Sequence, residues 1–97
     1  MRIEVPDLSA WQGHTPVLVD DIASSGRTLA EAARGLAAQG LGRPVCVVVH
    51  PLFADGAWEA LAPLFSRIAS TDSVPHPSNC IALAPLLADA LRRGLRD

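Results

Sequence analysis

The residues best suited to chemistry lie together in one short segment, residues 17–29. Two adjacent acids, Asp20 and Asp21, follow the apolar run Val17-Leu18-Val19 and precede a loop of small and polar residues. The loop residues that could bind a ligand are Ser24, Ser25, Gly26, Arg27 and Thr28. A helix that begins in such a loop presents unsatisfied N–H groups and a positive dipole end, which favour a phosphate group. The segment therefore predicts a phosphate-binding loop, with the hydroxyl side chains as further donors.

The acid pair restricts the kind of ligand. Two carboxylates repel a bare anion, so they favour a ligand that also carries hydroxyl groups or a divalent cation. A phosphorylated sugar meets both needs: Asp20 and Asp21 would accept hydrogen bonds from ribose hydroxyls, beside or through Mg²⁺, while residues 24–28 hold the 5-phosphate. The structural alternative is that the acids cap a strand and the loop only forms a turn and a helix cap. The loop is not a Walker motif, because no Lys follows its single glycine.

The elements that would position this loop alternate along the chain. Apolar, β-branched runs predict strands at residues 17–21, 45–50 and 67–70. Apolar residues at helical spacing predict helices at 29–37, 58–62 and 83–95. Residues 71–79 are predicted as loop, and Ile3-Glu4-Val5 as an additional edge strand. This order predicts an α/β fold, a small three-layer parallel sheet with flanking helices, whose strands carry ligands at their carboxyl ends.

Length and composition favour a single domain over residues 1–97 and exclude several partner classes. The net charge of −2 comes from dispersed charges without a basic run, so nucleic acid is not an expected partner. No segment has the roughly 20 apolar residues that a membrane span needs, and the start of the chain lacks the apolar core of a signal peptide. We therefore expect a cytoplasmic protein that does not contact a membrane.

The remaining reactive side chains have no spacing typical of a metal or redox site. Cys46 lies in an apolar run and Cys80 in a polar loop, and both are expected to be reduced thiols. His50, at the end of a predicted strand, is expected to orient a loop. Solvent exposure is expected for His14, His76, Arg92, Arg93 and Arg96. Trp58 and Phe65 share the inward face of a predicted helix and are expected in the core.

The acid pair and loop resemble the phosphoribosyl pyrophosphate signature of type I phosphoribosyltransferases and their pyrophosphokinase relatives. Asp20, Asp21, Ser25, Gly26 and Thr28 match its two acids and its Thr/Ser-Gly-x-Thr ending. Three later segments are similar to those of the pyrophosphokinases: His50-Pro51-Leu52-Phe53-Ala54, Thr71-Asp72-Ser73-Val74-Pro75, and the final helix from Ile81 through Ala88. The whole chain thus resembles the carboxyl-terminal half of a ribose-phosphate pyrophosphokinase.

The resemblance implies an activity that belongs to a longer protein. Members of that family transfer the diphosphate of ATP to ribose 5-phosphate and use Mg²⁺ as cofactor. It implies that this chain binds ribose 5-phosphate or phosphoribosyl pyrophosphate, but supplies no catalytic or metal-binding residue, because the family's ATP contacts, metal-binding His and catalytic Lys and Arg precede the segment equivalent to Met1. We therefore expect the isolated chain to be inactive, an amino-terminal half as its partner, and a homo-oligomer.

Three positions depart from the family pattern and leave alternatives open. Ser24 stands where the pyrophosphokinases usually place a third acid, Ser25 replaces their Thr, and Arg27 replaces a small residue. Arg27 is expected to strengthen phosphate binding. Ser24 favours one alternative, a non-catalytic regulatory paralogue that binds phosphoribosyl compounds. The other alternative is a phosphoribosyltransferase proper.

Overall fold

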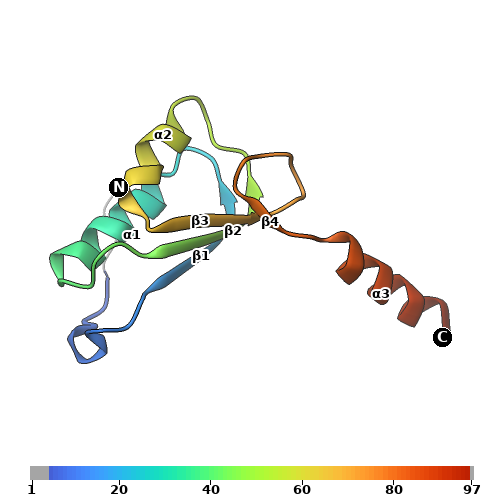
Figure 1. Cartoon of the computed structure of the whole chain (residues 1–97), viewed down its shortest axis with the longest axis horizontal. Helices are drawn as coiled ribbons and strands as arrows, with labels where there is room; N and C mark the ends of the chain where they lie inside the picture. The colour runs from blue at the N-terminus through green and yellow to red at the C-terminus, as the bar shows by residue number, and fades with distance from the viewer. Residues whose placement is uncertain (1–4, 97) are drawn as a thin grey trace.

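The computed structural model describes residues 5–96, with the side chain of Arg96 excepted. The edge strand predicted at Ile3-Glu4-Val5 lies outside these residues apart from Val5, and the predicted exposure of the Arg96 side chain lies outside them too. In chain order the elements are the 3₁₀ helix η1 (Ser9–Trp11), β1 (Val17–Ala23), α1 (Arg27–Ala38), β2 (Val45–Pro51), α2 (Ala57–Leu61), the 3₁₀ helix η2 (Ala62–Leu64), β3 (Arg67–Thr71), β4 (Asn79–Ile81) and α3 (Ala84–Arg96) (Figure 1).

The strands form one parallel sheet in the order β1-β2-β3-β4, so neighbours in sequence are neighbours in space. Val17 pairs with Val45, which pairs in turn with Arg67, and the first three strands therefore begin level with one another. The α/β class and the parallel sheet with flanking helices are confirmed. Because parallel strands end at the same edge, Asp20 and Asp21 near the end of β1 lie at the same edge as the loops that follow β2 and β3.

Helices α1 and α2 both pack on one face of the sheet. Leu29 of α1 and Leu61 of α2 join one buried cluster with Cys46 and Val48, which share a face of β2. On the other face Val17 and Val19 are 54% and 73% exposed. The described residues thus form two layers where the sequence predicted three. The strand order explains the difference, since successive right-handed crossovers in one direction place their helices on the same side.

Several element boundaries differ from those predicted. β1 continues to Ala23, two residues beyond the predicted end of the strand. The stretch predicted as loop at 71–79 includes the start of β4, whose backbone is held by bonds such as Asp72 N–H to the Ile81 carbonyl at 3.1 Å. Near Pro63 the helix α2 ends at Leu61 and passes into a 3₁₀ turn, as expected for a residue without an N–H.

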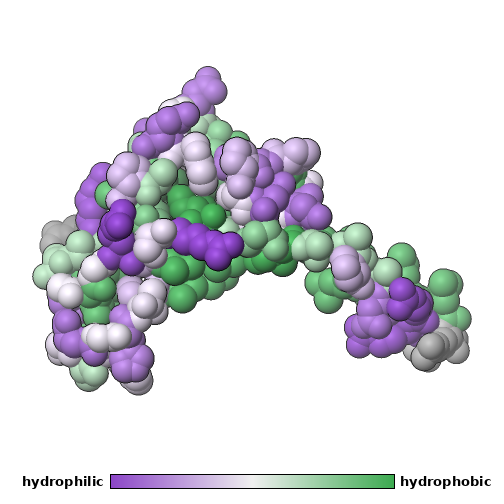
Figure 2. All heavy atoms as spheres, viewed as in Figure 1, coloured by the Kyte–Doolittle hydropathy of each residue, from purple (hydrophilic) through white to green (hydrophobic). Residues whose placement is uncertain are grey.

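Helix α3 projects from the end of β4 away from the rest of the molecule (Figure 1). The predicted amphipathic stripe is present, but the four leucines within α3, Leu86, Leu87, Leu91 and Leu95, are all exposed. Figure 2 shows apolar surface on this helix beside its charged residues. No helix in the described part of the chain is long and apolar enough to cross a membrane.

Candidate functional site

The loop between β1 and α1 encloses a cavity of about 130 Å³. Asp20 lines it, together with the entire loop of Ser24, Ser25, Gly26, Arg27 and Thr28. The structure therefore brings together six of the seven predicted site residues around one small space. Asp21 does not line this cavity; its side chain is exposed at the rim of the sheet.

The shape of the loop depends on Gly26. This residue has φ 76°, a left-handed conformation that favours glycine, and it immediately precedes the first residue of α1. It is also buried against α2, and a Cβ atom here would overlap the side chain of Leu61. Both the backbone angle and the lack of space therefore require glycine. The contact with Leu61 of α2 fixes the position of the turn that leads into α1.

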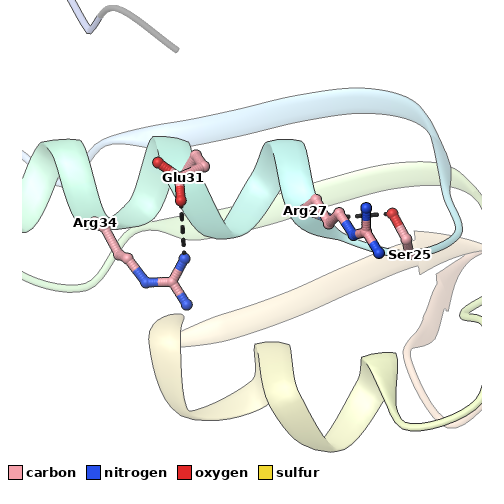
Figure 3. Close-up of polar contacts among 4 residues, drawn as sticks. All are labelled: Ser25, Arg27, Glu31 and Arg34. Carbon is pink, nitrogen blue, oxygen red and sulfur yellow. Dashed lines mark hydrogen bonds and ion pairs between the residues drawn. The ribbon is translucent and has the colours of Figure 1, made fainter. Parts of the chain in front are cut away.

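The start of α1 is weakly capped by side chains. Gly26 provides no capping side chain, and the Arg27 N–H lies 3.4 Å from Ser25 Oγ, a long distance for a hydrogen bond (Figure 3). The Arg27 side chain is exposed and forms no ion pair among residues 5–96, whereas Arg34 on the same helix is paired with Glu31 at 3.2 Å. An anion bound here would meet the helix N-terminus and a cation that has no ion-pair partner in the described part of the chain.

Each carboxylate of the acid pair is held by one backbone amide. Asp20 Oδ1 accepts from the Asp21 N–H, and Asp21 Oδ1 accepts from the Ile22 N–H, both at 2.8 Å. Among the described residues no further bond engages either Oδ2 atom, so each acid can offer one oxygen to a ligand.

Asp20 also affects Cys46: burial, and secondarily the charge of Asp20, raise the pKa of that thiol to about 11. Both cysteines are free thiols, as predicted, with Cys46 buried and Cys80 exposed.

The segment after β2 forms a wall of the site that the sequence did not indicate. The Phe53 N–H donates to the Ala23 carbonyl and the Ala54 N–H to the Ser24 carbonyl, both at 2.8 Å. Phe53 achieves this with a left-handed φ of 36°. A second cavity of about 400 Å³ lies between this wall and the loop, lined by Ser25, Arg27, Ala54, Asp55, Gly56, Ala57 and Ala60.

The histidines do not all lie where the sequence placed them. His14 is exposed, as predicted. His50 is bonded through Nδ1 to Ser73 Oγ at 2.9 Å, so it connects the end of β2 to the loop after β3. The predicted exposure of His76 is wrong: its ring is half-buried, with centroids 4.7 Å from Phe53 and 4.6 Å from Trp58. The ring of Phe53, which is distant in sequence, packs against the ring of His76 and covers part of it.

Of the two predicted core aromatics, Phe65 is buried and Trp58 is half-buried, in contact with His76. The three aromatic rings of Phe53, Trp58 and His76 thus form a cluster that includes the wall residue Phe53. The side chains of Arg92 and Arg93 on α3 are exposed, as predicted.

Known proteins are similar to this chain at the level of sequence. The model of the phosphoribosyl transferase domain matches residues 2–62. Ribose-phosphate pyrophosphokinase of Methanopyrus kandleri is 41% identical over 81 residues, covering 82% of this chain and 28% of that protein. The enzymes so named from Thermosipho africanus and Methanothermobacter thermautotrophicus are 34% and 35% identical, covering 84% and 95% of this chain.

These similarities are confined to part of the relatives. The chain spans 28% of the Methanopyrus kandleri protein and 32% of the Methanothermobacter thermautotrophicus one. No solved structure matches the chain. The family model nevertheless covers more than half of the sequence, including β1, the loop, α1, β2 and α2. The chain therefore belongs to the phosphoribosyl transferase domain family.

Proposed function

We propose that the chain binds ribose 5-phosphate or phosphoribosyl pyrophosphate, as part of a ribose-phosphate pyrophosphokinase that transfers diphosphate from ATP to ribose 5-phosphate. The observation that carries the proposal is the cavity that Asp20 shares with the loop of residues 24–28. A phosphate in this cavity is next to a helix N-terminus, and a sugar attached to it extends toward the acids. The names of the relatives support the reaction assigned to the parent enzyme.

The two acids have different tasks in this proposal. Asp20 lines the cavity and is half-buried, so its second oxygen would accept a hydrogen bond from a ribose hydroxyl close to the loop. Asp21 is exposed at the rim, where its second oxygen would meet the outer part of the sugar or a cation bound to it. The backbone bonds to both Oδ1 atoms keep the two carboxylates in place before the ligand arrives.

The acid pair fits Mg²⁺ only in company with a ligand. Among the described residues no three side chains of His, Cys, Asp or Glu are grouped so that they could hold a metal ion. Mg²⁺ commonly binds one or two carboxylates and completes its shell with water and substrate oxygens, which is what Asp20 and Asp21 allow. When bound, the ion would supply positive charge to balance the diphosphate.

The isolated chain is proposed to be inactive. Phosphoryl transfer depends on cations and metal ions placed around the migrating group. This chain contains no lysine, and Arg27 is the cationic residue that lines the loop cavity. The remaining groups are proposed to come from an amino-terminal half in a homo-oligomeric, cytoplasmic enzyme.

Isothermal titration calorimetry with ribose 5-phosphate and Mg²⁺ tests the binding step. The wild-type chain should release or absorb heat with a 1:1 stoichiometry, and Asp20→Asn and Asp21→Asn should bind at least about fivefold more weakly, since each loses a charge-assisted hydrogen bond. Asp89→Asn, which removes the same charge from α3, is the matched control and should bind like wild type. Absence of binding by the wild type, or equal loss in the control, would refute the proposed site.

Ser24 favours a second candidate, a regulatory relative that binds the same ligand without catalysis. The loop here has a neutral hydroxyl at this position, exposed and lining the cavity. The two candidates differ in the parent protein, where only the enzyme releases AMP from ATP in the presence of ribose 5-phosphate. Binding of ribose 5-phosphate without AMP release would select the regulatory candidate.

A further inference from the structure

The hydroxyl group of Ser73 determines which nitrogen of His50 carries the proton. Ser73 Oγ donates its only hydrogen to the backbone carbonyl of Val49, at 3.0 Å. When this bond is made, the contact of Ser73 Oγ with His50 Nδ1, at 2.9 Å, is one in which the ring nitrogen donates. His50 is then the Nδ1–H tautomer when neutral, and Nε2 carries a lone pair that can accept a hydrogen bond.

The hydrogen bonds of His76 indicate the opposite tautomer. Its Nδ1 accepts from the Ser78 backbone N–H at 3.1 Å, and an atom that accepts this bond cannot carry a proton. Neutral His76 is therefore the Nε2–H tautomer. The chain thus contains an internal reference for any measurement of the protonation pattern of His50.

His50 lies on the strand next to β1, and its pairing partner there, Ile22, lines the loop cavity. His50 pairs with Ile22 of β1, one residue after Asp21, and it starts the segment that continues to the wall at Phe53 and Ala54. Ser73 lies in the loop after β3, on the opposite side of β2 from β1. The two ring nitrogens point to different sides of the imidazole, so Nε2 is directed away from the β3 loop. The side chain is exposed, so a ligand can reach it.

We infer that Nε2 of His50 accepts a hydrogen bond from a hydroxyl group of the sugar phosphate bound at residues 24–28, which makes His50 a ligand-binding residue. The inference rests on the proposed function. His50 Nε2 would be a neutral acceptor beside the two acids. Ser73 would be a positioning residue, because its contact with Nδ1 fixes the tautomer of His50. Inorganic phosphate, which has no sugar hydroxyls, should occupy the loop without engaging His50.

The test is nitrogen-15 NMR of the labelled 97-residue chain at pH 8, without Mg²⁺. Before ligand is added, His50 should show a protonated Nδ1 and His76 a protonated Nε2, and Ser73→Ala should shift His50 toward the Nε2–H form. Inorganic phosphate should move the Gly26 amide resonance and leave His50 Nε2 unchanged. Ribose 5-phosphate should move both.

Each possible result has a separate meaning. A protonated Nε2 on His50 in the free chain, or an Nε2 resonance that ribose 5-phosphate does not move while Gly26 responds, overturns the inference and leaves the proposed function standing. Failure of Gly26 to respond to either ligand, both without Mg²⁺ and after Mg²⁺ is added, overturns the proposed function and the inference with it.

A pair of substitutions checks the inference by affinity. In His50→Asn the amide can replace Nδ1 as partner of Ser73 but does not reach the position of Nε2, whereas in His50→Gln it reaches Nε2 instead. His50→Asn should weaken ribose 5-phosphate binding about three- to tenfold, the value of one hydrogen bond, with no change for inorganic phosphate. His50→Gln should recover part of the loss. An equal loss for both ligands in His50→Asn would show a structural effect and refute the contact.

Discussion

Gly26 lies against the side chain of Leu61 so closely that no Cβ atom fits between them. The first residue belongs to the loop after β1 and the second to α2, which follows the next strand. Leu61 is 2% exposed and belongs to the main apolar cluster. The position of the proposed phosphate loop is therefore set by its contact with the hydrophobic core.

Substitution of Gly26 by Ala should destabilise the fold by about 2–4 kcal/mol in urea denaturation, because the change adds strain at positive φ to an overlap in the core. Gly56→Ala is the matched control. Gly56 precedes α2 as Gly26 precedes α1, has φ 80°, and has nothing within 4 Å of the added atom, so only the strain of about 1 kcal/mol should appear. Equal losses for the two variants would contradict the role of Leu61.

Arg27 should contribute to phosphate affinity through charge. Arg27→Gln is expected to weaken binding of ribose 5-phosphate about three- to tenfold and to reduce its dependence on salt, since the exposed guanidinium has no ion-pair partner among the described residues. Titration calorimetry at two salt concentrations measures both effects. Arg34→Gln, which breaks the pair with Glu31 further along α1, serves as control and should leave affinity unchanged.

Cys46 should make the fold sensitive to alkaline pH. Its pKa is raised from 9.0 to about 11 in the folded protein, so the unfolded chain loses its thiol proton first, and stability present below pH 9 is lost as pH rises toward 11. The expected loss between pH 8 and 10.5 is about 1–2 kcal/mol. The sequence contains no Lys or Tyr, so few other groups titrate in this window. Cys46→Val should abolish the loss, and Cys80→Ser should retain it.

Asn79 should be essential for the loop between β3 and β4. The two hydrogens of its Nδ2 are shared among three acceptors: Ser70 Oγ at 2.9 Å, the Thr71 carbonyl at 2.7 Å and the Val74 carbonyl at 3.1 Å. Asn79→Ala should cost about 2–3 kcal/mol in chemical denaturation, because it leaves partly buried acceptors without their donor. Asn79→Asp retains the oxygen that accepts from the His76 N–H but loses the donors, and should be nearly as damaging. A loss below about 0.5 kcal/mol for both would rule out this role.

Local sequence signals were sufficient for the elements that carry the site. The β-branched runs predicted β1, β2 and β3, and the apolar residues at helical spacing over 29–37 predicted α1. The cavity at residues 24–28 follows from a strand and a helix joined by small residues, and the sequence predicted that junction directly. Asp20 lines this cavity because it stands near the end of a parallel strand, where the loop begins.

Features that depend on residues far apart in the chain could not be predicted. Nothing near His76 indicates that Phe53 and Trp58 cover its ring. Phe53 itself adopts a left-handed backbone angle that a bulky residue rarely takes, and its N–H bonds to the carbonyl of Ala23, 30 residues earlier in the chain. The short strand β4 was missed because it pairs with β3 only through Asn79 and Ile81, next to a stretch whose composition is typical of a loop.

The exposed leucines of α3 imply that this helix melts on its own. Helices of about this length are marginal in water when they bury no apolar face, so α3 should follow a gradual helix–coil equilibrium instead of the cooperative transition of the sheet. Both tryptophans, Trp11 and Trp58, lie outside α3. Heating should therefore reduce the far-ultraviolet circular dichroism at temperatures where tryptophan fluorescence is still that of the intact sheet.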